Sequence, residues 1–553
     1  MSNASEKVSN LKSIIIKKIQ LITVEPIIFF NFLALALYYV SQHAVIYKTV
    51  CVQYFKINDS SINCDDLKSD PILEDKVQKS ASSWAMLLSL CYMIPAVPAD
   101  MFLGAWSDRH GRKVSILIGF AGLIFAAFPL ILVSGYPAHV PIYVLAFSNT
   151  VAGLTGYVAI IMISSLSYLA DLVQDRDTLI FRMTLVSVSR SISEVIGSFL
   201  LGRLLKILRP SAAILLAQII LTMGFFYSFA RIRQMPPEQM RRMYEIKGKN
   251  SIDKTQENRS IDKVAKNDEN VEKAKEVNSS KIGPFSELIS TWKYVCQLYK
   301  EVWHTLVKPR QHHKRAYMIL TIFIFFCYMM AELGLYTGPV LSLYVFHRPF
   351  FWTASSLGTF KGIQHSFALL ANILGACVMK KYLKAQETVV ILFALTSGIL
   401  HLTLTGLAHS GWMLYLAAGV GCFNTLLVAS LKSFLARQVE PDEVGKALAA
   451  NGIATDLAYV CTMLIFNNVY RATVSFCSGF AFLLAAFVML ICFFITLWMH
   501  LDLKKQLQLD KKTDLETAES GRGEKEKKEL DECEMRSIEL QAQGESVLSK
   551  RVK

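Results

Sequence analysis

The sequence predicts an all-α membrane protein in which twelve transmembrane helices form two six-helix bundles. The chain of 553 residues is 53% hydrophobic and only 18% charged, whereas a soluble chain of this size normally carries about 25% charged residues. Many stretches of roughly twenty residues are almost free of charge, which is the length needed to cross a hydrocarbon layer about 30 Å thick. These stretches are continuously apolar rather than alternating, which favours helices over the strands of a barrel.

One polar insert divides the chain into two hydrophobic halves. The predicted parts are an N-terminus at 1–25, a first bundle at 26–231, an insert at 232–315, a second bundle at 316–500 and a tail at 501–553. The twelve individual spans are predicted at residues 26–47, 83–104, 114–134, 141–169, 184–206, 211–231, 316–345, 356–379, 387–408, 411–436, 447–469 and 475–500.

The distribution of lysine and arginine predicts the orientation. These residues gather in the loops that follow even-numbered spans, such as Arg109, Arg112 and Lys113, whereas the loop "SGYPAHVP" after the third span has none. The basic residues at 203–209 are an exception. Cytosolic loops carry such an excess, so we expect both termini and the insert to be cytosolic. This distribution accounts for the net charge of +14, and we expect a lipid bilayer rather than nucleic acid as partner. The oligomeric state stays open.

The polar insert has two parts of different character. Residues 245–281 are highly charged and contain no aromatic residue, which predicts disorder. Residues 284–307 repeat large apolar residues at helical spacing, with Lys293, Lys300 and Glu301 between them. This pattern predicts an amphipathic helix at the membrane surface. Two interpretations of the helix stay open: a brace beneath the two halves, or a linker without that role.

The first outer loop is predicted at residues 48–82. It contains the acceptor sequence Asn58-Asp59-Ser60, which predicts glycosylation of Asn58 on the non-cytosolic side. Cys51 and Cys64 share this loop. Since the non-cytosolic side is oxidising, a local disulfide between them is compatible with the sequence, as are two free thiols.

A tight charge cluster, "GAWSDRHGRK", joins the second and third spans. We call residues 104–113 the signature loop. Gly104 and Gly111 allow a tight turn and close helix approach. Asp108 is suited to accept hydrogen bonds from the N-terminus of a neighbouring helix, and Arg112 and Lys113 to pair with carboxylates or lipid phosphates. The loop is predicted to be a conformational latch, although a plain basic turn is the simpler alternative.

Several ionisable residues lie inside predicted spans, where each costs about 2.5–3.5 kcal/mol on insertion scales. Arg190 and Glu194 are four residues apart and can pair on one helix face, either to serve transport or as a purely structural pair. Glu332 has no partner one turn away along its own span and is the preferred proton site. Lys361 and His365 are suited to meet a substrate carboxylate, or to reach toward the outer interface.

Tyr38, Tyr39 and Gln42 share one stretch of the first span. Their side chains are candidates for a substrate cavity, in which the aromatic rings would stack on a flat heterocycle. Tyrosines near a membrane interface also serve as anchoring residues, so both interpretations stay open.

The motifs of the chain resemble those of the major facilitator superfamily and, more narrowly, of its solute carrier 46 family, which includes the proton-coupled folate transporter. The resemblance rests on the motifs "LGAWSDRHGRK", "SYLADL" at 167–172, "FRM" at 181–183, "YVFHRPFFW" at 344–352 and "VEPDEVGKALA" at 439–449.

The resemblance implies roles for single residues. Asp108 and Arg112 match the latch of the family, and Asp171 matches an acid that relatives need for transport. Glu443 and Lys446 lie at the start of the eleventh span, where Asp108 would meet a helix N-terminus.

Three departures from the family are visible. Ser187 stands where the folate transporter has a glutamate linked to proton coupling. The seventh span has Glu332 instead of a histidine. The loop after that span reads Phe350-Phe351-Trp352 without a cysteine, which argues against a disulfide to the first loop.

The resemblance implies a secondary active transporter that works by alternating access, with a proton as coupling ion. The implied substrates are small organic anions or conjugated heterocycles: folate-like molecules, cyclic dinucleotides or muropeptide-like molecules. The implied membrane is the plasma membrane or an endolysosomal one. An exporter or antiporter of drugs or metabolites, or a non-transporting receptor or scaffold, stays open. We expect no enzyme, because a phosphate-binding loop, a His-Glu-x-x-His pair and a nucleophile elbow are missing, and we expect no cofactor or metal.

Overall fold

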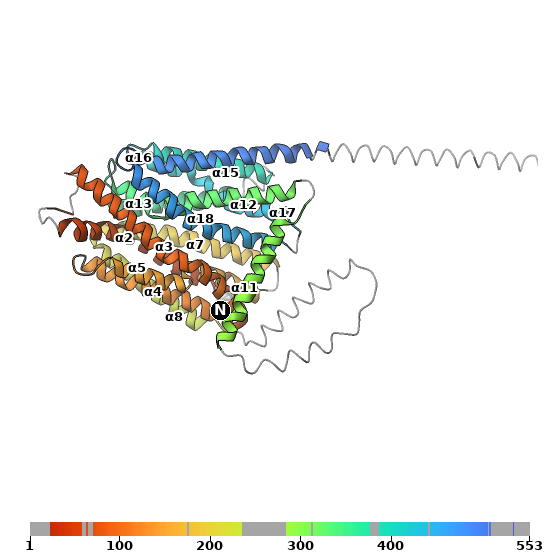
Figure 1. The fold of residues 1–553 in the computed structure, drawn as a ribbon, viewed down its shortest axis with the longest axis horizontal. Helices are drawn as coiled ribbons and strands as arrows, with labels where there is room; N and C mark the ends of the chain where they lie inside the picture. The colour runs from red at the N-terminus through yellow and green to blue at the C-terminus, as the bar shows by residue number, and fades with distance from the viewer. Residues whose placement is uncertain are drawn as a thin grey trace, which may run out of the picture.

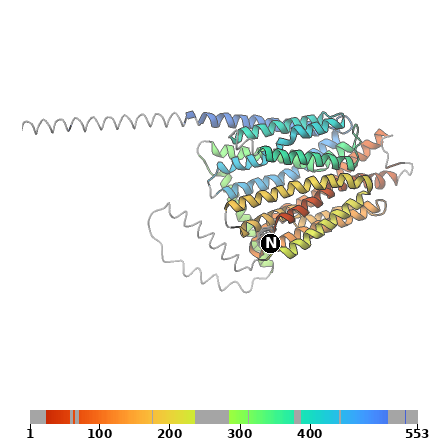
Figure 2. The ribbon, with the colours of Figure 1, turned by 180° about the vertical axis from the view of Figure 1, so that it is seen from behind.

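The computed structural model describes residues 23–57, 62–64, 70–173, 176–234, 284–310, 313–375, 386–440 and 443–506, together with residues 508, 509 and 535. Long helices run side by side along one direction, and one helix crosses their ends (Figures 1 and 2). The described residues contain no strand. The prediction of an all-α fold is therefore confirmed.

The first hydrophobic half folds into helices at all six predicted spans. Helix α2 packs against α7 and α8, α3 packs against α5, and α4 packs against α6 and α8. The helices are α2 (Glu25–Val50), continued by a π-helical segment (Cys51–Lys56), α3 (Pro71–His110), α4 (Arg112–Gly135), α5 (Tyr143–Leu154), α6 (Tyr157–Leu172), α7 (Arg176–Ile207) and α8 (Pro210–Arg231).

The second half also folds into helices at its six predicted spans. Helix α12 packs against α18, and α15 packs against α16 and α17. The elements are α12 (Lys314–Ala331), a π-helical segment (Glu332–Thr337), α13 (Pro339–Phe346), α14 (Ala354–Gly375), α15 (Glu387–Gly406), α16 (Gly411–Val420), a 3₁₀ segment (Gly421–Thr425), α17 (Leu426–Arg437) and α18 (Val444–Thr473), followed by a last helix at Phe480–Gln506.

Eleven helical stretches of the described chain are long and apolar enough to cross a membrane. The eighth predicted span, α14, is a 22-residue helix but is not among the eleven. Lys361, Gln364 and His365 lie within it, and these side chains lower its apolar character. Helix α14 packs against α7, and polar residues are tolerated in a membrane where they face protein or a water-filled cavity.

The first outer loop is much shorter than the predicted 48–82. Residues 48–56 continue the first span as helix, and α3 begins at Pro71. The Asp70 carboxylate starts α3 by accepting hydrogen bonds from the backbone N–H groups of Ile72 and Leu73, both at 3.1 Å. The charged residues Lys76 and Lys79 lower the hydropathy of this first part of α3, so the hydropathy pattern did not indicate a helix there. The Cys51–Cys64 disulfide, one of the two possibilities that the sequence left open, is present.

Three of the predicted spans are interrupted, which the continuous apolar pattern did not reveal. The fourth span breaks between α5 and α6, where Gly156 has a φ of +78° that favours glycine. The seventh contains the π-helical segment and the Gly338-Pro339 step, and the tenth contains the 3₁₀ segment at Gly421. Each is the first span of a set of three. Interrupted helices expose backbone groups and are common at the binding sites of transporters.

The two halves meet closely where α7 packs against α14. A methyl group built on Gly358 would lie 2.9 Å from the backbone N of Gly202, and one built on Gly202 would lie 2.9 Å from the backbone N of Thr359. The Ser355 hydroxyl donates a hydrogen bond to the Gly202 carbonyl at 2.7 Å. Only glycine permits this backbone approach, a usual feature of helix contacts in membranes.

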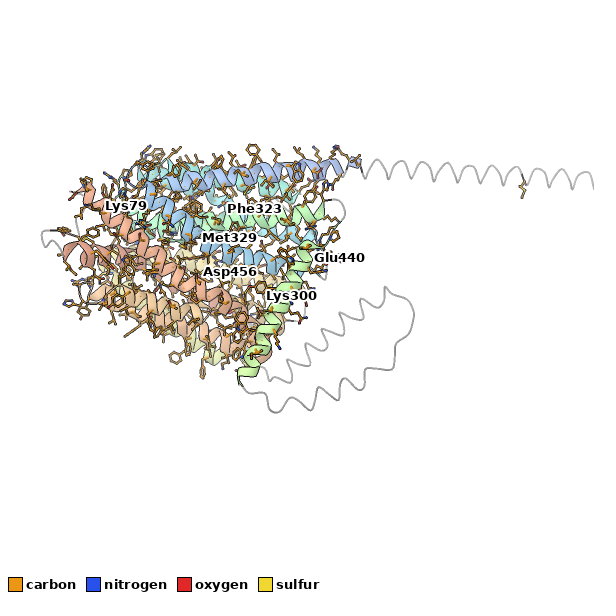
Figure 3. All side chains as sticks on the ribbon, in the orientation of Figure 1. Lys79, Lys300, Phe323, Met329, Glu440 and Asp456 are labelled. Atoms are coloured by element: carbon orange, nitrogen blue, oxygen red, sulfur yellow. A yellow bond between two sulfur atoms is a disulfide. The ribbon has the colours of Figure 1, made fainter. Side chains whose placement is uncertain are left out.

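Helix α11 (Pro284–Val307) occupies the residues for which an amphipathic helix is predicted, and it crosses one end of the bundle (Figure 1). We call this end the α11 end, and the opposite one, which carries Cys51–Cys64, the disulfide end. Figure 3 shows Lys300 and Glu440 at the α11 end and Lys79 toward the disulfide end. Helix α11 contacts both halves, because it packs against α3 and against α18.

Polar contacts attach α11 and the residues after it to the second half. Glu443 accepts hydrogen bonds from Lys308 at 2.9 Å and from Arg310 at 2.5 Å, and Lys446 pairs with Glu301 at 3.2 Å. The hydrogen bonds to Glu443 and Glu440 raise the pKa of Lys308. Toward the first half, the Trp292 ring lies 6.3 Å from the Phe102 ring, and the Tyr299 hydroxyl contacts the Met101 sulfur.

We expect Gly358→Val to lower the stability of the protein. The added side chain would collide with the backbone of α7, and overpacking of this kind costs about 1–3 kcal/mol. The measurement is the thermal unfolding temperature of the purified full chain. Gly452→Val is the matched control, because a methyl group at Gly452 meets nothing within 4 Å. Equal unfolding temperatures of the two variants would contradict the close contact of α7 and α14.

Glu443→Gln should also lower the unfolding temperature, because it leaves the buried Arg310 without its carboxylate. A hydrogen bond to a charged group contributes about 1.5–3 kcal/mol. Glu440→Gln is the control, since Glu440 is 60% exposed and its bond to Lys308 is that of a surface pair. If both variants unfold together, α11 is not held by Glu443.

Candidate functional site

Ionisable side chains from both halves gather between the helices. Arg190 donates a hydrogen bond to Glu194 at 2.9 Å, and Glu194 lies 3.9 Å from His365 of α14. Lys361 of α14 donates a hydrogen bond to the backbone carbonyl of Tyr336. Glu332 interacts electrostatically with Lys361, Glu194 and Arg190. We call these residues the central charge cluster: Arg190, Glu194, Glu332, Lys361 and His365.

The central charge cluster borders a space between the helices. The Arg190 side chain is 48% exposed, although it interacts with Glu332 of the second half and lies 4.5 Å above the Phe32 ring of α2. A side chain with partners on three helices and half of its surface free faces an opening rather than a packed core. The structure therefore brings together the five ionisable residues that the sequence singled out in three different spans.

A second group of polar aromatic side chains lies beside the first. The Tyr92 ring stacks on Tyr157 at 4.6 Å, and its hydroxyl hydrogen-bonds the hydroxyl of Tyr459 in the second half. Tyr39 interacts with the hydroxyl groups of Tyr157 and Tyr459 and with Arg190. We call Tyr39, Tyr92, Tyr157 and Tyr459 the tyrosine cluster. Through Tyr39 and Arg190, the tyrosine cluster adjoins the central charge cluster.

The sequence analysis named only part of this aromatic group. The centre of the Tyr38 ring lies 6.0 Å from the centre of the Tyr39 ring, but Tyr38 is itself buried. Gln42 is buried one turn further along α2. Tyr92, Tyr157 and Tyr459 were missed, because they lie in three different spans and only the folded bundle brings their rings together.

The signature loop is organised around Arg112. Its guanidinium pairs with Asp108, donates to the Ser107 hydroxyl at 2.8 Å and donates to Asp171 at 3.2 Å. Gly111 has a φ of +104°, so this turn requires glycine. Asp108, Arg112 and Asp171, predicted from two distant motifs, thus form one network.

The other predicted latch residues have different surroundings. The Lys113 ammonium lies 4.7 Å from the centre of the Phe229 ring. Glu443 and Lys446 are paired with Arg310, Lys308 and Glu301 around α11. A methyl group on Gly104 would meet no atom within 4 Å, so the close helix approach expected there is absent from this conformation. Asn58 lies outside the described residues.

At the disulfide end the two halves are joined by polar contacts that the sequence analysis did not foresee. Arg348 donates two hydrogen bonds to the Asp75 carboxylate, at 3.0 and 3.1 Å, and His347 contacts the same carboxylate at 3.0 Å. Gln78 donates to the Leu343 carbonyl at 2.5 Å. His43 of α2 contacts the Ser342 hydroxyl at 2.9 Å.

A buried ion pair within the first half was also missed. Arg182, in the "FRM" motif, donates hydrogen bonds to both oxygens of the Glu25 carboxylate, at 2.8 and 3.0 Å. This bidentate pair joins the start of α7 to the start of α2, and both side chains are at least 90% buried. Among the residues that the structure describes, no group of three or more His, Cys, Asp or Glu side chains is placed to hold a metal ion.

Comparison with known proteins identifies relatives of this chain. Residues 27–463 match the family model described as Major Facilitator Superfamily. The chain is 23% identical over 487 residues to the chicken (Gallus gallus) lysosomal proton-coupled steroid conjugate and bile acid symporter SLC46A3, covering 87% of this chain and 94% of the relative. It is 22% identical over 427 residues to the rat (Rattus norvegicus) proton-coupled folate transporter, covering 77% and 80%.

A shorter match and the solved structures agree with these relatives. The chain is 24% identical over 198 residues to a probable peptidoglycan muropeptide transporter SLC46 of Drosophila melanogaster, covering 35% of this chain and 37% of the relative. A POT family transporter in complex with 5-aminolevulinic acid superposes with a TM-score of 0.54 at 14% identity, covering 86% and 95%. This likeness shows the fold alone. With the family model matched over most of its length, the chain belongs to the major facilitator superfamily, and its similarity to solute carrier 46 proteins confirms the narrower resemblance.

Proposed function

We propose that this protein is a secondary active transporter that moves a small organic anion across a membrane by alternating access, with a proton as coupling ion. The central charge cluster is the observation that carries the proposal. It unites ionisable side chains of α7, α14 and the π-helical segment. Charges are costly inside a bilayer and are retained there for substrate or ion binding. The relatives named above are transporters, which supports the same reading.

The charges of the cluster suit an anionic substrate. Arg190, Lys361 and His365 offer cationic or hydrogen-bond-donating groups, while only Glu194 and Glu332 are carboxylates. Glu194 already holds Arg190 and lies near His365, so a substrate carboxylate would compete for the same donors. The tyrosine cluster supplies flat aromatic surface beside these donors. We therefore propose a substrate with an anionic group and a planar or polycyclic part, as in folates and steroid conjugates.

Glu332 is the proposed proton site. It stands where α12 gives way to the π-helical segment, so its position changes if that segment rearranges. Its electrostatic interactions link it to Lys361 in its own half and to Glu194 and Arg190 in the other. A carboxylate that is shared between the halves changes its neighbours when the halves rock, and this change is what couples protonation to transport.

The same proposal assigns the two ends of the bundle to the two gates. The disulfide end is closed by direct contacts between the halves. At the α11 end, a methyl group on Gly104, Gly445 or Gly452 would meet no atom within 4 Å. We infer that these faces of α3 and α18 approach each other in the opposite conformation, in which Asp108 interacts with the N-terminus of α18.

The basic loops support a placement of the α11 end, both termini and α11 itself on the cytosolic side. The disulfide end and Asn58 would then face the exterior or an endolysosomal lumen, where disulfides persist. In this placement α11 lies at the membrane surface and braces the two halves. Drug or metabolite export by the same fold, or a receptor role without transport, would use the same cluster differently, and the uptake test below separates them.

We expect saturable uptake of a labelled member of a panel of folates, steroid sulfates and muropeptides into proteoliposomes, faster with an acidic exterior than with equal pH. Glu332→Gln should abolish the stimulation by the proton gradient but retain exchange of substrate for substrate, because the amide imitates a permanently protonated carboxyl. Glu440→Gln is the control on an exposed carboxylate. Binding of a panel member without uptake would support a receptor, and uptake driven only by outward exchange would support an antiporter.

Tyr92→Ala should raise the KM for a planar substrate by roughly 3- to 10-fold, since aromatic stacking contributes about 0.5–1.5 kcal/mol. Tyr92→Phe keeps the ring and should retain most of the affinity while losing the hydrogen bond to Tyr459. Tyr143→Ala, which removes a tyrosine that is 66% exposed, is the control. An unchanged KM in Tyr92→Ala would exclude the tyrosine cluster from the substrate site.

A further inference from the structure

Helix α11 leaves a row of large apolar side chains exposed along one flank. They are separated by 3, 11 and 4 residues, which are close to whole numbers of helical turns, so they lie on one side of the helix. All four side chains are between 41% and 68% exposed. A continuous apolar surface of this kind usually meets lipid or a partner. We call these residues the apolar flank: Ile289, Trp292, Trp303 and Val307.

The middle of α11 lies beside the transmembrane helices rather than beyond their ends. The Trp292 ring contacts the ring of Phe102, and the Tyr299 hydroxyl contacts the sulfur of Met101. Both partners lie more than two turns before the end of α3. From the other half, Asp456 interacts electrostatically with Tyr299, and it lies about three turns into α18. This depth suits the boundary between lipid headgroups and acyl chains, where amphipathic helices bind.

Two lysines lie next to the apolar flank, on the side of α11 that faces away from the bundle. Lys293 and Lys300 are seven residues apart, which is two turns, so they share one side of the helix. Val295 and Val302 each follow a lysine by two residues, and both are buried. Two residues correspond to about 200° around a helix. The lysines therefore lie opposite the buried face, and both are exposed.

Both lysines border one hollow of the protein surface, in which their positive charge is not balanced. The stretch between them contains no acidic residue. The Glu301 carboxylate, which follows Lys300, pairs with Lys446 at 3.2 Å. Among the residues that the structure describes, no carboxylate forms an ion pair with Lys293 or Lys300. The hollow is lined by Lys293, Lys300, Ile289, Trp292, Cys296 and Gln297.

From this arrangement we propose that α11 binds an anionic phospholipid of the cytosolic leaflet, with the phosphate between Lys293 and Lys300 and the acyl chains on the apolar flank. Lysine binds phosphate as a compact point charge on a long, flexible stem, so two such side chains can reach one phosphate from positions two turns apart. The headgroup occupies the hollow, and the chains cover the aromatic and aliphatic side chains beside it.

The combination of groups favours a phospholipid over a soluble anion. A soluble anion contacts the lysines but leaves the apolar flank in water. A phospholipid satisfies both, because its charge and its hydrocarbon are joined in the order in which α11 presents lysine and apolar side chains. Tryptophan is enriched at the level of lipid headgroups, and Trp292 and Trp303 both belong to the flank. Basic residues on an amphipathic helix are the usual means of recognising anionic lipids at a membrane surface.

The bound lipid would act on the connection between the two halves, because α11 packs against both α3 and α18. Trp292 lines the hollow and also contacts Phe102 of α3. A lipid that binds more tightly in one conformation of the halves shifts the population toward that conformation. This regulatory consequence rests on the proposed transport function. Lipid binding itself needs only the placement of α11 at the membrane surface.

The test uses Cys296, an exposed thiol that lines the hollow, as a reporter of occupancy. The full chain is placed in nanodiscs of phosphatidylcholine with increasing fractions of phosphatidylserine. The rate at which an uncharged, water-soluble maleimide alkylates Cys296 is followed by mass spectrometry of the peptide that contains it. Phosphatidylserine should slow this alkylation in a saturable manner, because the bound headgroup covers the thiol.

Matched lysine variants show whether the protection depends on this site. The phosphatidylserine fraction that gives half of the maximal protection should rise about fivefold in Lys293→Gln and in Lys300→Gln, since one lysine near an anionic surface contributes roughly this factor to binding. Lys314→Gln is the control, because it removes an exposed lysine at the same end of the bundle. Each variant is compared with itself in pure phosphatidylcholine, which cancels any change in the reactivity of the thiol.

Two further arms identify the occupant. Inorganic phosphate added to protein in pure phosphatidylcholine should leave the alkylation rate unchanged, and Trp303→Ala should weaken the protection by phosphatidylserine although it removes no charge. Full protection by inorganic phosphate would assign the hollow to a soluble anion and overturn the proposal. Equal protection in Lys293→Gln, Lys300→Gln and Lys314→Gln would also overturn it.

Uptake measured with the same protein in phosphatidylserine-containing liposomes separates this proposal from the transport proposal. If phosphatidylserine protects Cys296 through the two lysines but no substrate is transported, the lipid site stands and the transport proposal fails. If gradient-driven uptake occurs while phosphatidylserine leaves the alkylation of Cys296 unchanged, transport stands and the lipid site is excluded.

Discussion

Several charges inside the described part of the bundle are met by partners, some of them on another helix, because hydrocarbon offers none. Arg190 is shared between Glu194 and the electrostatic field of Glu332, Arg182 holds Glu25, and Arg112 lies between Asp108 and Asp171. These pairs fix which helices can be neighbours. Of these charges, Arg190 lies at the boundary between the halves, because Glu332 belongs to the second half.

The apolar contacts have the complementary role. Where α7 meets α14, glycine and serine bring the backbones of the two halves together. The interrupted spans have the opposite property, since the breaks at Gly156, Glu332–Thr337 and Gly421 leave backbone groups outside regular α-helical geometry. The bundle thus combines rigid contact between the halves with local irregularity close to the site.

The sequence predicted the fold well, because hydrophobic length is a direct consequence of membrane thickness. It predicted the helix ends that extend beyond the apolar stretches less well. The start of α3 was assigned to a loop, because Lys76 and Lys79 break the apolar pattern while Asp70 and Pro71 still start a helix. The breaks in three spans were missed because hydropathy measures side chains, whereas the interruption concerns backbone hydrogen bonds.

The candidate site was only partly visible for a related reason. Arg190, Glu194 and Glu332 stand out because a charge in a span is unusual. Tyr92, Tyr157 and Tyr459 do not, because tyrosine is common in such helices and their proximity depends on how three helices pack. The contacts of Asp75 with His347 and Arg348 at the disulfide end were harder still to foresee. Asp75 lay in the supposed loop, and its partners are 272 and 273 residues away along the chain.

The position of Arg112 has a consequence for the energy of switching. Its guanidinium contacts Asp108, Ser107 and Asp171 at the same time. Asp108 is therefore only one of its three partners. If Asp108 turned to the helix end of α18, Arg112 would keep Ser107 and Asp171 as oxygen partners. The release of Asp108 would thus leave no uncompensated guanidinium, which is the costly outcome when a buried ion pair is broken.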